Sequence, residues 1–119
     1  MRLDFLAFTT WLGQQPAART FQARQECRCP VAEWLREAHN APSPVVDYTT
    51  YQLDYQPISA QWGPLPDPFV SFVQRLDNNH PVGVVLATSA LELATAICRL
   101  YELEVPPSNT TGCGSLRGK

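Results

Sequence analysis

Two cysteines at the start of a predicted helix are the residues whose types and spacing point most directly to chemistry. Cys27 and Cys29 flank Arg28, and Pro30 follows them at the first position of an amphipathic segment. Proline there favours a helix start because its backbone angle is already helical. A thiol at a helix N-terminus loses its proton more easily, and the thiolate is a nucleophile and a metal ligand. One hypothesis is therefore a zinc-stabilised or thiol-reactive domain.

The spacing of the thiols and imidazoles argues against that hypothesis. Paired zinc ligands usually have about two to four residues between them, whereas a single residue lies between Cys27 and Cys29. A cysteine hydrolase needs a histidine base beside its thiol, and His39 would lie about 15 Å along the helix from Cys29. His80 falls in a predicted turn. We therefore predict no enzyme and no cofactor, and Cys27 and Cys29 stay as alternative metal ligands.

The segment before the helix carries three arginines, and these residues suit an acidic protein or a phosphate backbone. They are Arg19, Arg24 and Arg28, and Phe21 lies among them. The whole chain has nine basic and eleven acidic residues and a net charge of −2. Nucleic-acid binding usually needs clustered Lys and Arg. A protein partner is therefore favoured over nucleic acid, which stays as the second alternative.

A proline-flanked loop over residues 58–66 contains a tryptophan that fits no helical stripe. Trp and Arg are the residue types that dominate protein-binding hot spots. We interpret Trp62 and Leu65 as partner-contacting residues; the alternative is that Trp62 folds back over the core. The residues expected to bind a partner are Trp62, Leu65, Arg19, Arg24 and Arg28.

Apolar residues recur at helical spacing in four segments of the chain. Asp67 is expected to cap the third helix, and the capping box from Ser89 to Glu92 to start the fourth. The predicted helices cover residues 3–14, 30–39, about 67–76 and about 90–102. Between them, residues 17–29 are expected to be irregular.

Residues 45–55 are rich in Val, Thr and Tyr and predict a strand with a bend near residues 49–50. Residues 82–87 fit either a short strand or the front of the last helix. A strand needs a partner for its backbone groups, which residues 82–86 or a second copy in a homodimer would supply. We predict a helix-dominated α+β fold, with about four helices packed on a small antiparallel sheet or a single hairpin.

The length of 119 residues suits one domain, predicted over residues 1–104, with a flexible tail over 105–119. The N-terminus does not read as a secretory signal, because its apolar run is short and is broken by Asp4. No stretch reaches the roughly 18 apolar residues that span a bilayer. We expect a cytoplasmic protein without a membrane partner.

Two segments of the N-terminal third resemble short bacterial and prophage proteins of unknown activity. Residues 5–16 read FLAFTTWLGQQP, and residues 29–35 read CPVAEWL. Those proteins open with a Phe/Trp-Leu helix and a Gln-Pro break, followed by a Cys-x-x-Ala-x-x-Leu helix. The resemblance implies no particular activity, but it favours a product of a phage or another mobile element. Small proteins of that kind often dock on a host target, as anti-CRISPR proteins do, so we expect an inhibitor that docks on a host protein complex.

Overall fold

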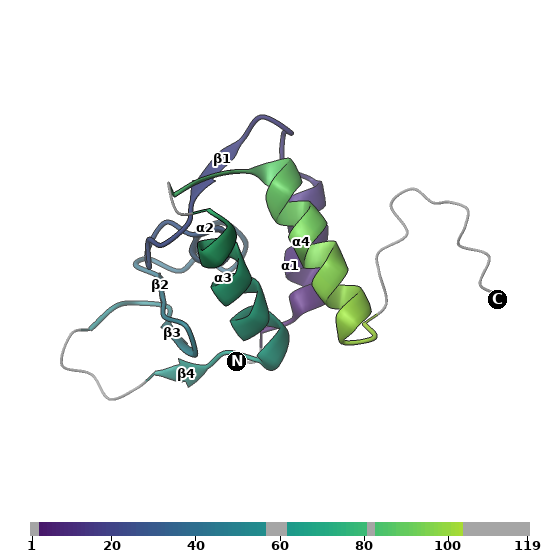
Figure 1. Cartoon of the computed structure of the whole chain (residues 1–119). Coiled ribbons are helices and arrows are strands. Elements are labelled where there is room, and N and C mark those ends of the chain that lie inside the picture. Colours follow the sequence, from purple (N-terminus) through teal and green to yellow (C-terminus); the bar gives the residue numbers. More distant parts are fainter. Residues whose placement is uncertain (1–2, 57–61, 81–82, 104–119) are drawn as a thin grey trace.

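The computed structural model describes residues 3–56, 62–80 and 83–103. As predicted, these residues form a helix-dominated α+β fold with small antiparallel sheets (Figure 1). Helices α1 and α4 lie side by side, and α3 packs against α4. The helices are α1 (Phe5–Gly13), α2 (Pro30–Ala38), α3 (Asp67–Asn79) and α4 (Ala87–Leu100).

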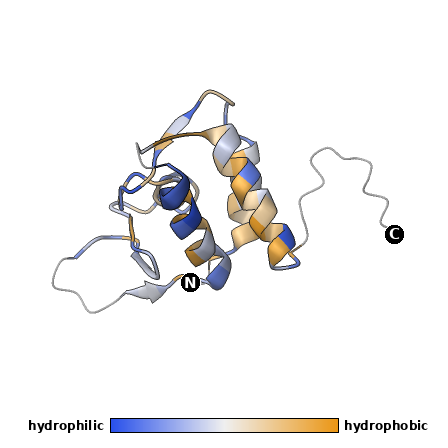
Figure 2. Ribbon diagram, in the orientation of Figure 1, coloured by the Kyte–Doolittle hydropathy of each residue, from blue (hydrophilic) through white to orange (hydrophobic). Residues whose placement is uncertain are grey.

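The core is built around the fully buried ring of Phe8 on α1. Its centroid lies 5.1 Å from that of Phe72 and 5.4 Å from that of Trp34, both edge-on. Phe5 and Phe69 complete the cluster at 5.6 Å each. These rings come from α1, α2 and α3, so the aromatic cluster joins three helices. Figure 2 shows the hydrophobic colouring of α1 and α4 and the hydrophilic C-terminal end of α3.

The predicted start of α2 at Pro30 is confirmed. Cys29 is the extended residue before the helix, and Pro30 takes its first position. Helix α1 begins in a similar way after Asp4, whose side chain accepts hydrogen bonds from the N–H groups of Leu6 (3.0 Å) and Ala7 (3.4 Å).

Two predicted helix caps are wrong. Asp67 is the first residue of α3, and Pro66 precedes it as the capping residue. Helix α4 begins at Ala87, so Ser89 lies inside the helix rather than at its cap. The reason is that Val84–Leu86 forms a strand and the chain turns into the helix directly after it, with Leu86 as the extended residue.

A two-stranded antiparallel ribbon joins β1 (Thr20–Gln22) to β5 (Val84–Leu86), with Phe21 opposite Val85. This corrects two predictions: the irregular segment 17–29 contains a strand, and that strand is the partner of β5. Each strand has a single buried residue at its centre, Phe21 (2% exposed) in β1 and Val85 (1% exposed) in β5. One buried residue per strand is too few for the alternation of apolar and polar residues to be recognised in the sequence.

A second sheet has the order β2-β3-β4 and is antiparallel throughout. Its strands are β2 (Val45–Val46), β3 (Thr50–Gln52) and β4 (Gly63–Pro64). The expected long strand is therefore a hairpin that turns at Asp47, whose N–H donates to the carbonyl of Thr50 at 2.8 Å. Gly63 lies close beside Tyr51, and a Cβ there would lie 2.8 Å from the tyrosine ring and would force the ring to shift.

In the described ranges, no helix has the length and apolar character needed to cross a membrane. The predicted tail over residues 105–119 lies outside the described residues.

Candidate functional site

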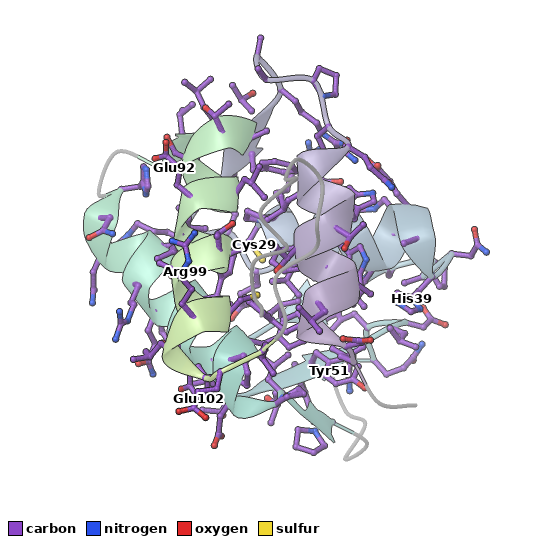
Figure 3. All side chains as sticks on the ribbon, turned by 90° about the vertical axis from the view of Figure 1, so that its right-hand side faces the viewer. Cys29, His39, Tyr51, Glu92, Arg99 and Glu102 are labelled. Atoms are coloured by element: carbon purple, nitrogen blue, oxygen red, sulfur yellow. The ribbon has the colours of Figure 1, made fainter. Side chains whose placement is uncertain are left out.

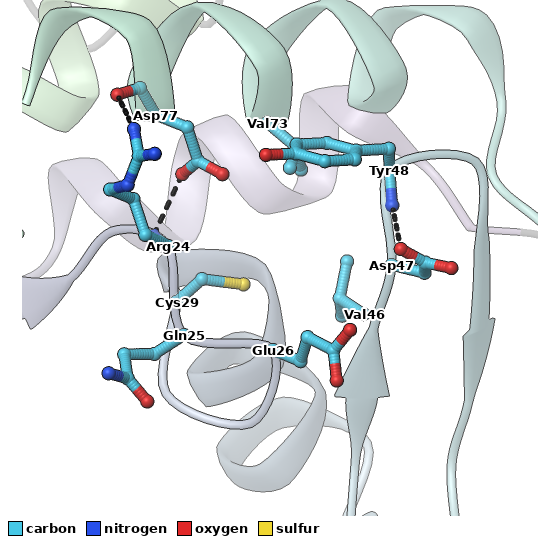
Figure 4. Close-up of a pocket in the computed structure, with 9 residues that line it drawn as sticks. All are labelled: Arg24, Gln25, Glu26, Cys29, Val46, Asp47, Tyr48, Val73 and Asp77. Carbon is cyan, nitrogen blue, oxygen red and sulfur yellow. Dashed lines mark hydrogen bonds between the residues drawn. The ribbon is translucent and has the colours of Figure 1, made fainter. Parts of the chain in front are cut away.

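The candidate site is a surface pocket of about 220 Å³ between the turn after β1, the β2–β3 hairpin and helix α3 (Figure 4). Its lining combines carboxylates, a phenol, a thiol and two valines. The lining residues are Arg24, Gln25, Glu26, Cys29, Val46, Asp47, Tyr48, Val73 and Asp77.

Asp77 holds the turn after β1 in place from helix α3. Its carboxylate accepts a hydrogen bond from the backbone N–H of Arg24 at 2.8 Å, and its carbonyl accepts one from the Arg24 guanidinium at 3.1 Å. Arg24 adopts φ of 64°, in the left-handed region that side chains other than glycine disfavour. The Asp77 side chain is 6% exposed, so this bond is shielded from water and fixes the strained residue.

Tyr48 forms the opposite wall of the pocket. Its ring lies beside Val73, and its hydroxyl faces the Asp77 carboxylate in Figure 4. The negative charge of Asp77 beside the phenol raises the pKa of Tyr48. Asp47 orders the hairpin turn by accepting a hydrogen bond from the Tyr48 N–H at 2.8 Å.

Cys29 lies at the interior side of the pocket and is 5% exposed. Figure 3 shows it in the interior, whereas Glu92 and Arg99 lie on the outer side of α4 and Glu102 lies just past its C-terminal end. Burial raises the pKa of the Cys29 thiol to about 12, and the backbone N–H groups of the first turn of α2 oppose this more weakly. The helix N-terminus therefore does not make Cys29 a thiolate at neutral pH.

The two thiols of the Cys27–Cys29 segment are expected to differ in reactivity. In the folded protein at pH 8, iodoacetamide should alkylate exposed Cys27 while Cys29 stays unmodified, since Cys29 is both buried and protonated. Peptide mass spectrometry measures the two sites separately. In urea both should react at similar rates, and fast labelling of Cys29 in the folded state would contradict this account.

The structure separates the predicted metal ligands and gives them different surroundings. Cys27 is exposed and its carbonyl accepts a hydrogen bond from Arg36, while Cys29 is buried. His39 lies at the far end of α2 with its ring edge-on to Trp34. Among the described residues, no three His, Cys, Asp or Glu side chains are grouped so that they could hold a metal ion.

Of the predicted partner-binding arginines, Arg19 is engaged within the fold. Its guanidinium forms a bidentate ion pair with the Glu37 carboxylate. The guanidinium carbon also lies 5.3 Å from the ring centroid of Trp11 and 4.8 Å from that of Phe21. The hydrogen bond from Arg19 lowers the pKa of Glu37. This cluster ties α2 to the start of β1, and it lies apart from the pocket that Arg24 lines.

Trp62 and Leu65, the other predicted binding residues, differ in exposure. Leu65 is 5% exposed and belongs to the core, so its side chain is not on the surface. Trp62 is half-buried and packs edge-on against Tyr55, with a centroid separation of 6.3 Å. In Figure 1 strand β1 lies at the top of the molecule and strand β4 at the bottom. Trp62 and Leu65, which flank β4, therefore do not form one surface with the arginines that flank β1. Arg28 is exposed at the end of the β1–α2 turn.

The pocket contains residues that sequence reasoning missed, chiefly Tyr48 and Asp77. The signal for Asp77 was present: it lies four residues after Val73, and so continues the apolar stripe of α3. A carboxylate at such a position is buried, and buried polar groups need hydrogen-bond partners. Tyr48 carried no comparable signal, because its position depends on the hairpin turn.

The fold and site define a small α+β domain with a pocket of negative charge at its surface. No protein family matches the chain, and neither a curated protein nor a solved structure is significantly similar to it.

Proposed function

We propose that this chain is a small, non-enzymatic protein-binding module, and that it receives a basic side chain of its partner in the pocket beside Tyr48. The observation that carries the proposal is the lining of this pocket, which combines negative charge, an aromatic face and apolar walls.

The charge of the lining favours a cation. Glu26, Asp47 and Asp77 carry three negative charges, against the single positive charge of Arg24. The Arg24 guanidinium is already bonded to the Asp77 carbonyl. The pocket therefore attracts a positively charged group of the partner. The arginines of the sequence had instead suggested an acidic partner.

The shape and apolar walls of the pocket favour a side chain over a cofactor. Pockets for drug-sized molecules measure about 300–1,000 Å³, and this one measures about 220 Å³. Val46 and Val73 can pack against the aliphatic stem of lysine or arginine. The ring of Tyr48, 47% exposed, offers a face for a cation–π contact with the charged end.

The chemistry of the lining supports binding rather than catalysis. A nucleophile or a general base must be unprotonated at the working pH. Cys29 is protonated far into the alkaline range, and the Asp77 carboxylate already accepts a hydrogen bond from the Arg24 backbone.

The proposal extends to an inhibitor from a phage or another mobile element, docking on a host protein complex. Its support is the resemblance of residues 5–16 and 29–35 to prophage proteins.

The test titrates the ¹⁵N-labelled protein with N-acetyl-arginine amide and with the citrulline analogue, which has the same shape without the charge. We expect saturable chemical-shift changes at the amides of Asp47 and Tyr48 with arginine, and much smaller ones with citrulline. Glu26→Gln should weaken arginine binding several-fold, because it removes one of the three negative charges.

Glu92→Gln is the matched control, since it removes an equivalent charge from the exposed face of α4. Its affinity for the arginine probe should equal that of the wild type. Equal shifts with arginine and citrulline, or an equal loss in both variants, would overturn the proposed pocket.

A further inference from the structure

Strand β5 has a strand on one side only in the described part of the chain, and that strand is β1. The ladder between them is defined by hydrogen bonds at alternate residues. The N–H of Ala23 donates to the carbonyl of Gly83 at 2.6 Å, and the N–H of Ala87 donates to the carbonyl of Arg19 at 2.8 Å. In an antiparallel ladder the intervening residues point their backbone groups the other way. Val84 therefore directs its N–H and its carbonyl to the edge away from β1. Leu86 directs its N–H there, while its carbonyl accepts the first hydrogen bond of α4 as the N-cap residue.

The same two residues carry the exposed apolar side chains of the ribbon. Val84 is 53% exposed and Leu86 is 46% exposed, while Val85 between them is buried. Natural edge strands discourage pairing by being very short or by carrying lysine, proline or a bulge, and of these devices β5 has the short length, three residues. The three residues of β5 and the three of β1 are all uncharged and none is proline.

The absence of charge on these two strands favours a second copy of this chain as the occupant of the edge. In a two-fold antiparallel pair each residue near the axis meets its own copy, so a charged residue would face a like charge. Val84 supplies both a donor and an acceptor to the edge, so two copies of Val84 can exchange both hydrogen bonds. Their side chains then lie next to each other on the exposed face, flanked by Leu86.

We infer that β5 pairs with β5 of a second copy and forms a four-stranded sheet with the order β1-β5-β5-β1. The buried face of the ribbon, at Phe21 and Val85, already packs on the core, and the pairing would cover the exposed apolar side chains of Val84 and Leu86. This interface is separate from the pocket beside Tyr48 and does not depend on the function proposed for it.

The test is sedimentation velocity of the full chain over a wide range of concentrations. We expect a monomer–dimer equilibrium in the wild type, and a monomer for Val84→Lys, because two ammonium groups would then meet at the axis. Val84→Glu should also be monomeric. An equimolar mixture of Val84→Lys and Val84→Glu should dimerise again, since the two charges are then opposite.

Leu100→Lys is the matched control, because Leu100 is 58% exposed on α4 and not part of the ribbon. It should dimerise as the wild type does, and circular dichroism confirms that each variant is folded. If the wild type is monomeric at every concentration, the inference is wrong. The candidate occupant of the β5 edge would then be a strand of a different protein. A dimer that survives Val84→Lys, or a mixture that stays monomeric, also overturns the inference.

Discussion

Replacing Phe8 with alanine should destabilise the protein by about 3–5 kcal/mol, the usual cost of emptying a buried phenylalanine site. Phe8 is fully buried, and its ring contacts those of Trp34, Phe69 and Phe72 from two other helices. The cavity cannot close without moving α2 or α3 toward α1. A domain of this size usually has about 5–15 kcal/mol of stability in total, so the loss is a large part of it. Urea unfolding followed by circular dichroism measures the change.

Tyr101→Ala is the control for Phe8→Ala, because it removes an aromatic ring that is 38% exposed at the end of α4. Its effect should be a small fraction of the Phe8 effect. A loss at Phe8 below about 1 kcal/mol would mean that the aromatic cluster does not hold the helices together.

Replacing Asp77 with alanine should cost about 1.5–3 kcal/mol, the range for hydrogen bonds to charged groups. The change leaves the Arg24 N–H without its acceptor at a left-handed residue, and it removes the group that Tyr48 faces. The turn after β1 should loosen, so the Arg24 amide should also exchange faster with solvent. Urea unfolding and hydrogen exchange measure the two effects.

Asp77→Asn separates the hydrogen bond from the charge, because its side-chain oxygen can still accept from Arg24. It should retain more of the stability than alanine does. Asp54→Ala, at an exposed carboxylate, should change stability by no more than about 0.5 kcal/mol. If Asp77→Ala is equally mild, the turn is held by other contacts.

The helices could be predicted from the sequence because their apolar residues recur with a strong period. Phe69, Phe72 and Leu76 mark the buried face of α3, and Val31, Trp34 and Leu35 mark that of α2. The strands could not be placed as accurately as the helices, since each has only two or three residues. An alternation of apolar and polar residues needs more repeats than that to be recognised. The partner of β5 was missed because Phe21 lies in a polar segment far away along the chain.

The pocket was harder to predict than the helices because it depends on three distant segments meeting. Arg24 was interpreted from the sequence as an anchor for an acidic partner, and Cys29 as a candidate metal ligand. Their roles changed once Asp77 was found beside them, since it binds the backbone of Arg24 and burial keeps Cys29 protonated. Leu65 read as a loop residue because proline surrounds it, yet its side chain reaches the core. Local composition shows where a loop lies, but not which of its side chains turn inward.

Strand β5 passes into α4 without a connecting loop, because Leu86 ends the strand and Ala87 begins the helix. A loop between two elements normally acts as a hinge and lets each move on its own. Here the direction of the strand sets the direction of the helix axis, so whatever orients the ribbon also orients the fourteen residues of α4. The other end of α4 is fixed as well, since Ile97 and Cys98 are fully buried. The ribbon and the helix should therefore move as one rigid unit with the core.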